Sequence, residues 1–179
     1  MAFVLDQAHT NIDFSVKHMM VANVRGTFKK FTGEVEIDEA KPENSKVSVT
    51  IDTASVDTGM DVRDNHLRSA DFFDAETYPT ITFVSTRIER QGEERGRIYG
   101  DLTIHGVTRE VPLDVTFEGQ MKDREGNRHG GFSASGTISR KEFGLNWNVA
   151  LESGGWLVSD VIKLVIEAEV VEKVPAPVA

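Results

Sequence analysis

Apolar and polar residues alternate along most of the chain, and a period of two is typical of β-strands with one buried face. The clearest case is 11–18, where Ile12, Phe14, Val16 and His18 share one face. Seven further stretches alternate in the same way, at 24–37, 46–52, 80–88, 97–105, 109–119, 132–140 and 159–171. Polar or glycine-containing segments separate most of them, so the pattern predicts about eight strands joined mainly by short hairpins.

Two local features refine this prediction. The apolar parity changes between Phe28 and Phe31, which predicts a β-bulge at 29–30. The dipeptide Gly-Val at 106–107 suits a two-residue hairpin turn with glycine first. Because the strands follow one another without a βαβ rhythm, we expect an all-β protein, a lipocalin-like antiparallel β-barrel of about eight strands.

Small residues fall on the predicted inward faces of several strands. They are Gly26, Gly100, Ala134, Gly136 and Ala168. Glycines can let strands coil at the corners of a barrel, and this interpretation is compatible with a filled interior. Alternatively, the missing side chains leave a cavity, since a barrel of about eight strands has room for one small ligand. The sequence leaves both interpretations open.

The segment 58–79 does not alternate and predicts one short helix. Residues 65–70 suit a helical turn, which Asp61 or Asp64 would cap. Leu67, Phe72 and Phe73 make the segment too apolar to lie free in water, and its acidic residues keep it out of a core. We therefore expect a helical lid across one end of the barrel.

Composition narrows the class of protein. The chain has 179 residues, a formal net charge of -9 and no cysteine, which disfavours nucleic acid as a partner and excludes disulfides and thiolate metal ligands. No window suits an integral membrane segment, and the first residues lack the apolar run of a signal peptide. We expect one domain over 1–172, a flexible tail at 173–179, and a cytoplasmic location, or a periplasmic one if a leader has been removed.

Two polar side chains fall on apolar faces. His18 ends its inward face, where its ring could bond to a ligand headgroup or to a carbonyl at the rim. Arg140 continues the inward face of 132–138, and a buried guanidinium requires a partner. We predict an ion pair from Arg140 to Asp64 or Asp71, which would latch the lid onto the barrel.

Motifs for catalysis or metal binding are missing from the sequence. The five histidines show neither H-x-x-x-H nor H-x-H spacing, and no G-x-S-x-G occurs. We therefore predict no metal, no cofactor and no turnover. Phe143 and Trp147 alternate with glycine and asparagine, so their segment is expected to flank the mouth of the barrel.

A set of short motifs follows in a fixed order along the chain. It comprises D-x-x-H (Asp6, His9), F-x-V-x-H (14–18), R-G-x-F (25–28), F-x-G (31–33), R-D-x-H-L-x-S-x-D-F-F-D (63–74), Y-P-x-I-x-F (78–83), L-T-I-H-G-V-T (102–108) and R-K-E-F-G (140–144). Together these motifs make most of the chain resemble the YceI-like family. The resemblance implies a lipocalin-like barrel that binds polyisoprenoids or similar lipids, with a long-chain lipid threaded through its interior.

On this basis we expect binding, transport or storage of an isoprenoid-type lipid. The residues expected to contact it are Phe14, Val16, His18, Phe28, Ile51, Leu67, Phe72, Phe73, Phe83, Ile104, Phe132, Ile138, Phe143 and Trp147. One alternative is an enzyme that acts on such a lipid or uses a bound quinone, with His18 or His66 as acid and base. Another is a ligand-free barrel with a filled interior that serves in a stress response. Besides the hydrophobic ligand, a second copy of the chain is an open option as partner.

Overall fold

The first and last strands of the chain lie side by side, and this pairing closes the sheet. In the computed structural model, which describes residues 1–173, β11 (Val161–Glu172) pairs with β2 (Asn11–His18) near its start and with β1 (Ala2–Leu5) near its end. In turn, β1 pairs with β4 (Phe31–Glu36), and β2 pairs with β3 (Ala22–Phe28). Thus β1 and β2 form one interrupted strand, as do β3 and β4.

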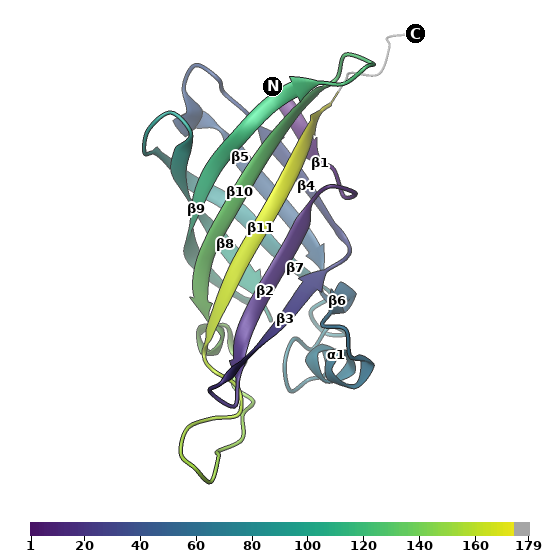
Figure 1. Ribbon diagram of the computed structural model, residues 1–179, viewed down its shortest axis with the longest axis vertical. Helices are drawn as coiled ribbons and strands as arrows, with labels where there is room; N and C mark the ends of the chain where they lie inside the picture. Colours follow the sequence, from purple (N-terminus) through teal and green to yellow (C-terminus); the bar gives the residue numbers. More distant parts are fainter. Residues whose placement is uncertain (174–179) are drawn as a thin grey trace.

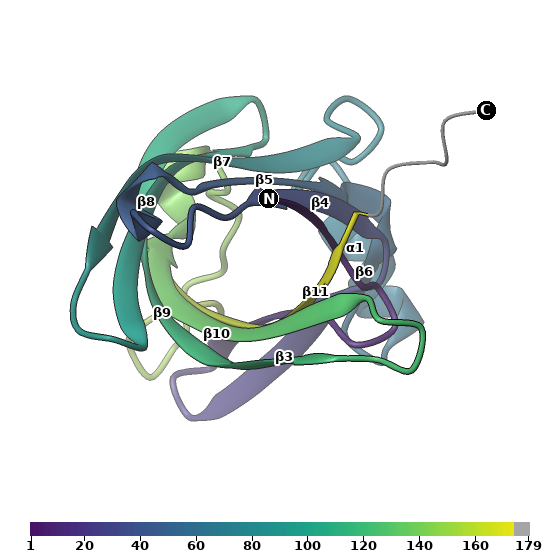
Figure 2. The same ribbon diagram turned by 90° about the horizontal axis from the view of Figure 1, so that it is seen from above.

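Five uninterrupted strands lead from β4 around to β11. They are β5 (Lys46–Asp52), β7 (Thr80–Arg90), β8 (Arg95–Ile104), β9 (Val107–Lys122) and β10 (Arg128–Ser139). All neighbours are antiparallel, and counting each interrupted pair once gives a closed barrel of eight strand positions (Figures 1 and 2). The predicted lipocalin-like antiparallel barrel is confirmed.

The interruption between β3 and β4 falls where the apolar parity changes. The two lysines at 29–30 separate buried Phe28 from buried Phe31, as the predicted bulge required, but the structure has a full break in the strand. Beyond the break, β4 pairs with β5, whereas the end of β3 pairs with the two-residue strand β6 (Val56–Asp57). The break therefore lets the chain leave the barrel wall and support the lid.

The hairpin between β8 and β9 turns one residue earlier than predicted. His105 and Gly106 occupy the turn, both with positive φ (54° and 72°), and Val107 already belongs to β9. Positive φ at both central residues is the signature of a type I′ turn, and a β-branched residue such as Val107 avoids that conformation. The prediction of a turn at 106–107 is therefore wrong by one position.

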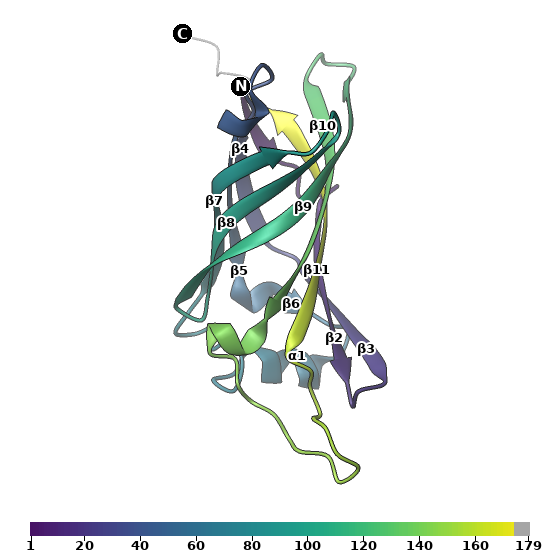
Figure 3. The same ribbon diagram turned by 90° about the vertical axis from the view of Figure 1, so that its left-hand side faces the viewer.

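One α-helix, α1 (Asp61–Arg68), is present among the described residues and lies at one end of the barrel beside β6 (Figures 1 and 3). It begins before the predicted 65–70, and no side chain caps it, so the prediction of an Asp61 or Asp64 cap is wrong. Instead, the Asp64 carboxylate turns back to the chain that precedes the helix. Three short 3-10 helices complete the fold: η1 (Pro42–Asn44), η2 (Thr53–Ser55) and η3 (Arg140–Phe143).

The fully buried core is concentrated on one side of the barrel and continues into the lid end. Its members come from strands β3 to β9 and from η3 and the residues after it: Phe28, Phe31, Ile51, Val56, Ile81, Leu102, Ile104, Val111, Phe143 and Leu145. Among the residues that the structure describes, no helix has the length and apolar character needed to cross a membrane. The predicted tail falls, for positions 174–179, outside the described residues.

Candidate functional site

The inward faces predicted from parity line up in register across four strands. Gly136 of β10 lies opposite Leu164 of β11, Leu164 lies opposite Phe14 of β2, and Phe14 lies opposite Gly26 of β3. Directly opposed residues of an antiparallel pair point to the same face, so these side chains form one continuous row. A neighbouring row places Ala134, Ile166 and Ile12 side by side.

The inward apolar residues of the barrel are buried to different degrees. On β3 to β9 some of them are buried, including the predicted Phe28, Ile51 and Ile104, and others are half-buried, including the predicted Phe83. On β2, β10 and β11 the inward apolar side chains are half-buried except for that of Val170, and we call the half-buried ones the accessible wall: Ile12, Phe14, Val16, Phe132, Ala134, Ile138, Ile162, Leu164, Ile166 and Ala168. Partial exposure of an apolar inner face leaves apolar surface that a ligand could cover.

The glycines are not the source of that space. A methyl group built on Gly26 would lie 2.3 Å from Cζ of Phe14, and one on Gly100 would lie 2.3 Å from Cζ of Phe83. On Gly136 it would lie 2.9 Å from Cδ2 of Leu113. The interpretation that these glycines leave a cavity is therefore wrong, because a large side chain of a nearby strand covers each one. Of the small inward residues, Ala134 and Ala168 remain on the accessible wall.

Aromatic rings lead from the barrel interior into the lid. The ring of Phe28 lies 5.6 Å from that of Phe14 and 5.8 Å from that of Phe73, which follows α1 in the chain. Leu67 of α1 packs against the same core and is half-buried. Leu67 and Phe73 thus extend the apolar core of the barrel towards α1, which lies beside β6 at one side of the opening (Figure 2).

A second aromatic group lies farther out on the lid. Trp147 packs against His66 at 4.6 Å and against Phe72 at 5.3 Å, measured between ring centroids. Phe72 is buried, whereas Trp147 and His66 are half-buried. The structure therefore divides the predicted aromatic residues of the lid: Phe73 faces the interior, and Phe72 joins α1 to the segment 144–160.

Arg140 does not latch the lid. Its side chain is buried, with 3% exposed, and donates to four main-chain carbonyl oxygens. These belong to Leu145 (2.6 Å), Ser159 (2.9 Å), Trp147 (3.0 Å) and Val158 (3.1 Å). The predicted ion pair with Asp64 or Asp71 is wrong, because the irregular segment 144–160 supplies carbonyls that lack sheet partners and need donors. Burial lowers the pKa of Arg140, and nearby Asp160 opposes that shift.

The two aspartates bind within the lid instead. Oδ1 of buried Asp64 accepts from the main-chain N and from Oγ1 of Thr58, at 2.8 and 2.5 Å. Oδ2 of Asp71 lies 2.9 Å from Nε2 of His66. Arg68 at the end of α1 donates to the carbonyl oxygens of 54 and 56, which tie the helix to β6. The helix α1 is therefore held by hydrogen bonds to the chain at 54–58, next to β6, and not by an ion pair with Arg140.

The mouth of the barrel is completed by the end of β2. His18 is half-buried and forms an isolated bridge with Val158, and the main chain of residue 19 donates to the carbonyl of Leu157. His18 and Trp147 thus belong to the same end of the molecule. Figure 3 shows α1, η3 and the 144–160 segment gathered at this end.

Comparison with known proteins identifies the family. The model of the YceI-like domain matches residues 3–170. The chain belongs to the YceI-like family. A UPF0312 protein of Staphylococcus epidermidis is 42% identical over 168 residues, which cover 93% of this chain and 95% of that protein.

Solved structures of YceI-like proteins share the barrel. A YCEI protein of Campylobacter jejuni is 38% identical, has a TM-score of 0.78, and the match covers 88% of this chain and 90% of that one. A polyisoprenoid binding domain from Saccharophagus degradans has a TM-score of 0.66 at 19% identity, over 94% of this chain and 97% of that domain. The latter likeness establishes the fold alone.

The YceI-like D-x-x-H motif forms the corner between β1 and β2, in the wall of the barrel beside β11. Asp6 Oδ2 lies 2.8 Å from Nδ1 of His9, and this hydrogen bond lowers the pKa of Asp6 and raises that of His9. One ligand atom from each of Asp6, His9 and Glu169 could approach a metal ion, since the three lie within 4.8 Å of one another. The absence of a metal stays a prediction.

His129 extends this group and was missed at the level of sequence, where it reads as part of a polar hairpin. Its Nδ1 lies 2.7 Å from Oε1 of Glu169, and its Nε2 lies 3.1 Å from Oδ2 of Asp123. Hydrogen bonds to the two carboxylates raise the pKa of His129, and Glu169 has the larger effect. Alternation alone could not reveal the contact, because it depends on the register between β10 and β11.

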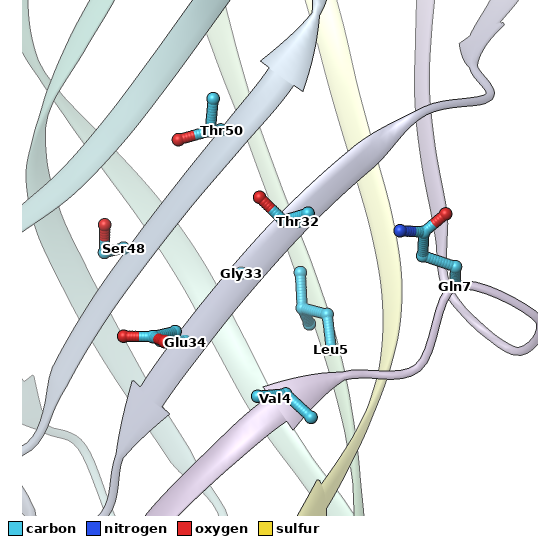
Figure 4. Close-up of a pocket in the computed structure, with 8 residues that line it drawn as sticks. All are labelled: Val4, Leu5, Gln7, Thr32, Gly33, Glu34, Ser48 and Thr50. Atoms are coloured by element: carbon cyan, nitrogen blue, oxygen red, sulfur yellow. The ribbon is translucent and has the colours of Figure 1, made fainter.

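A separate hollow of about 340 Å³ lies beside β1, β4 and β5 (Figure 4). Its lining is Val4, Leu5, Gln7, Thr32, Gly33, Glu34, Ser48 and Thr50. None of these residues was predicted to bind the ligand. Most of them are polar, so the hollow does not suit an apolar molecule.

Proposed function

We propose that the barrel binds a long-chain lipid of the isoprenoid class without chemical turnover. The apolar tail lies along the accessible wall of β2, β10 and β11, and the polar end lies near the lid, within reach of His18 and Trp147. The protein then carries or stores the lipid away from water.

The observation that carries this proposal is the half-buried state of an otherwise apolar wall. Its side chains form continuous rows across β2, β10 and β11, which suit a long, flexible and uncharged chain. Burying a five-carbon isoprene unit contributes about 4 kcal/mol at about 0.8 kcal/mol per carbon, so a few units suffice for tight binding without a charged contact. The name of the Saccharophagus degradans domain, which shares the fold, agrees with this class of ligand.

Binding without turnover accounts for the histidines better than catalysis does. His66 is held between Asp71, Phe72 and Trp147, where it joins the lid to the mouth of the barrel. This arrangement gives it a structural role. The alternative of an enzyme with His18 or His66 as acid and base predicts a product that disappears in the His66→Gln variant.

The test is mass spectrometry of an organic extract of the purified protein, combined with titration of the stripped protein with a fluorescent polyprenol analogue. We expect about one lipid per chain and saturable binding of the analogue. A protein that yields no lipid and binds no analogue would contradict the proposal and favour a filled barrel.

A further inference from the structure

Large apolar side chains protrude from two turns at the lid end. We call this set the tip patch: Met19 (49% exposed), Met20 (52%), Val21 (83%), Val149 (46%) and Trp156 (50%). The first three lie on the turn between β2 and β3, and the others lie on the hairpin within 144–160. Both turns occur at the end of the barrel that carries the mouth (Figures 1 and 3).

The two turns form one surface. The main-chain N of Met19 donates to the carbonyl oxygen of Leu157 at 2.8 Å. The side chain of Met20 lies against Gly155, where an added methyl group would be 3.3 Å from Cγ of the methionine. The apolar side chains therefore extend from a common base and reach solvent together.

The turn between β2 and β3 keeps its methionines despite an unfavourable backbone. Met19 and Met20 have φ values of 51° and 66°, and the N–H of Val21 donates to the carbonyl of His18. This is a type I′ turn, which favours Asn-Gly and disfavours two long side chains. Strained residues persist where another requirement outweighs the strain, and here the methionines contribute exposed apolar surface at the tip.

Basic residues flank one of the two turns of the tip patch. The segment 17–25 contains Lys17 and Arg25 and no acidic residue, although the chain carries a net charge of -9, and the hairpin of Val149 and Trp156 contributes one acidic residue, Glu152. Nζ of Lys141 lies 5.8 Å from the ring of Trp156. A tryptophan beside a lysine suits the boundary between water and acyl chains, where indole rings and ammonium groups collect.

We propose that the tip patch inserts into the surface of a lipid bilayer and so brings the mouth of the barrel to the membrane. This inference rests on the proposed function, because a lipid carrier must load and unload at a membrane. Flexible exposed methionines beside a tryptophan and a lysine fit the deformable boundary of a bilayer. The basic residues at 17–25 favour an anionic leaflet and orient the acidic barrel away from it.

Flotation with vesicles of phosphatidylcholine and phosphatidylglycerol tests the proposal. The variant Met19→Asn/Met20→Gly gives the type I′ turn its preferred residues, so it should fold at least as stably as the wild type while losing both side chains. We expect its vesicle binding to fall at least about tenfold, since each side chain contributes more than about 1 kcal/mol when buried in lipid. The control is Met121→Ser on β9, 73% exposed, which should float like the wild type.

Fluorescence supplies a second readout. Brominated phosphatidylcholine should quench Trp156 in the wild type, and the quenching should fall in Trp156→Phe. A wild-type protein that does not float, or a turn variant that floats as well as the wild type, would overturn the proposal. The proposal would also be overturned if the protein formed a concentration-dependent dimer that the turn variant abolishes and that added vesicles do not dissociate. The tip patch would then contact a second copy of the chain.

The two proposals fail separately. Lipid extraction and analogue binding in solution do not require the tip patch, so a protein that retains ligand but does not float keeps the proposed function and loses the docking surface. A protein that floats through the tip patch but holds no lipid keeps the docking surface and loses the proposed function.

Discussion

The ring of Phe14 covers the backbone of Gly26 directly across the β2–β3 pair, with Cζ only 2.3 Å from where a methyl group on the glycine would lie. Gly26→Ala therefore forces the ring to move. We expect a loss of about 1 to 3 kcal/mol in the free energy of unfolding, measured by urea denaturation. Gly131→Ala is the matched control, because its nearest neighbour would lie 3.5 Å away. Equal losses in the two variants would show that the Phe14 contact is not responsible.

Ala134→Phe separates a hollow barrel from a filled one. Ala134 lies on the accessible wall, so an added ring should occupy ligand space and lower analogue binding at least about tenfold while stability changes by less than about 1 kcal/mol. In a filled interior the same change would cost about 1 to 3 kcal/mol through overpacking. Ser135→Phe, on the exposed face of the same strand, should leave analogue binding unchanged.

Arg140→Gln should loosen the segment 144–160. The variant leaves several of the four carbonyls without a donor, and we expect a loss of about 3 kcal/mol in the free energy of unfolding. Hydrogen exchange should show the amides of 145–159 losing protection before the barrel strands do. Lys141→Gln, at the exposed neighbouring position, should change stability by less than about 0.5 kcal/mol. If Arg140→Gln behaved like this control, the carbonyl contacts would be unimportant.

Asp64→Ala should release the lid while the barrel stays folded. The change removes the acceptor for the N–H and hydroxyl of half-buried Thr58, and we expect a loss of about 2 kcal/mol in the free energy of unfolding, because the N–H is left without this partner. Since α1 holds His66 against Trp147, tryptophan fluorescence should shift to longer wavelength and the analogue should dissociate faster. Asp61→Ala, in the exposed first turn of the same helix, is the control; identical dissociation rates in the two variants would argue against Asp64 as the latch.

The contacts of His129 predict a dependence of stability on pH. Glu169 and Asp123 raise the pKa of His129 in the folded protein above the ordinary 6.5. The stabilisation that protonated His129 provides is therefore complete below about pH 6.5 and is lost as the pH rises through the folded-state pKa. The pKa of Asp123 is lowered, which keeps that carboxylate charged over this range. The free energy of unfolding should therefore fall more steeply in the wild type than in His129→Gln as the pH rises above about 6.5. The pKa of His9 is also raised, so the comparison should be repeated in proteins that carry His9→Gln. Parallel pH profiles for the wild type and His129→Gln would contradict the assignment to His129.

Sequence alternation was sufficient to place the walls of the barrel, because a strand with one buried face leaves a direct record in its residues. Phe14, Phe132 and Ile138 were assigned inward on this ground, and the register of β2, β10 and β11 places them so. The lid was predicted from the loss of that alternation. The turn at 105–106 was misplaced because histidine adopts positive φ less often than glycine, so the sequence pointed to the wrong pair.

Contacts between strands distant in sequence could not be predicted. Gly26 and Gly100 looked like vacancies because Phe14 and Phe83 become their neighbours only when the register is known. We predicted a carboxylate partner for Arg140 because the sequence shows which side chains are charged but not which main-chain carbonyls lack a partner. The acceptors of Arg140 lie in a segment without regular structure.

The pairing of β11 with both β1 and β2 has a consequence for how the molecule is made. During translation the first hairpin leaves the ribosome long before the strand that seals it, and until then both margins of the growing sheet carry unpaired main-chain groups. Sealing joins residues separated by almost the whole polypeptide, which makes it a slow, late event and leaves the nascent molecule open to aggregation. A chain that stops short of residue 161 should therefore never acquire a barrel.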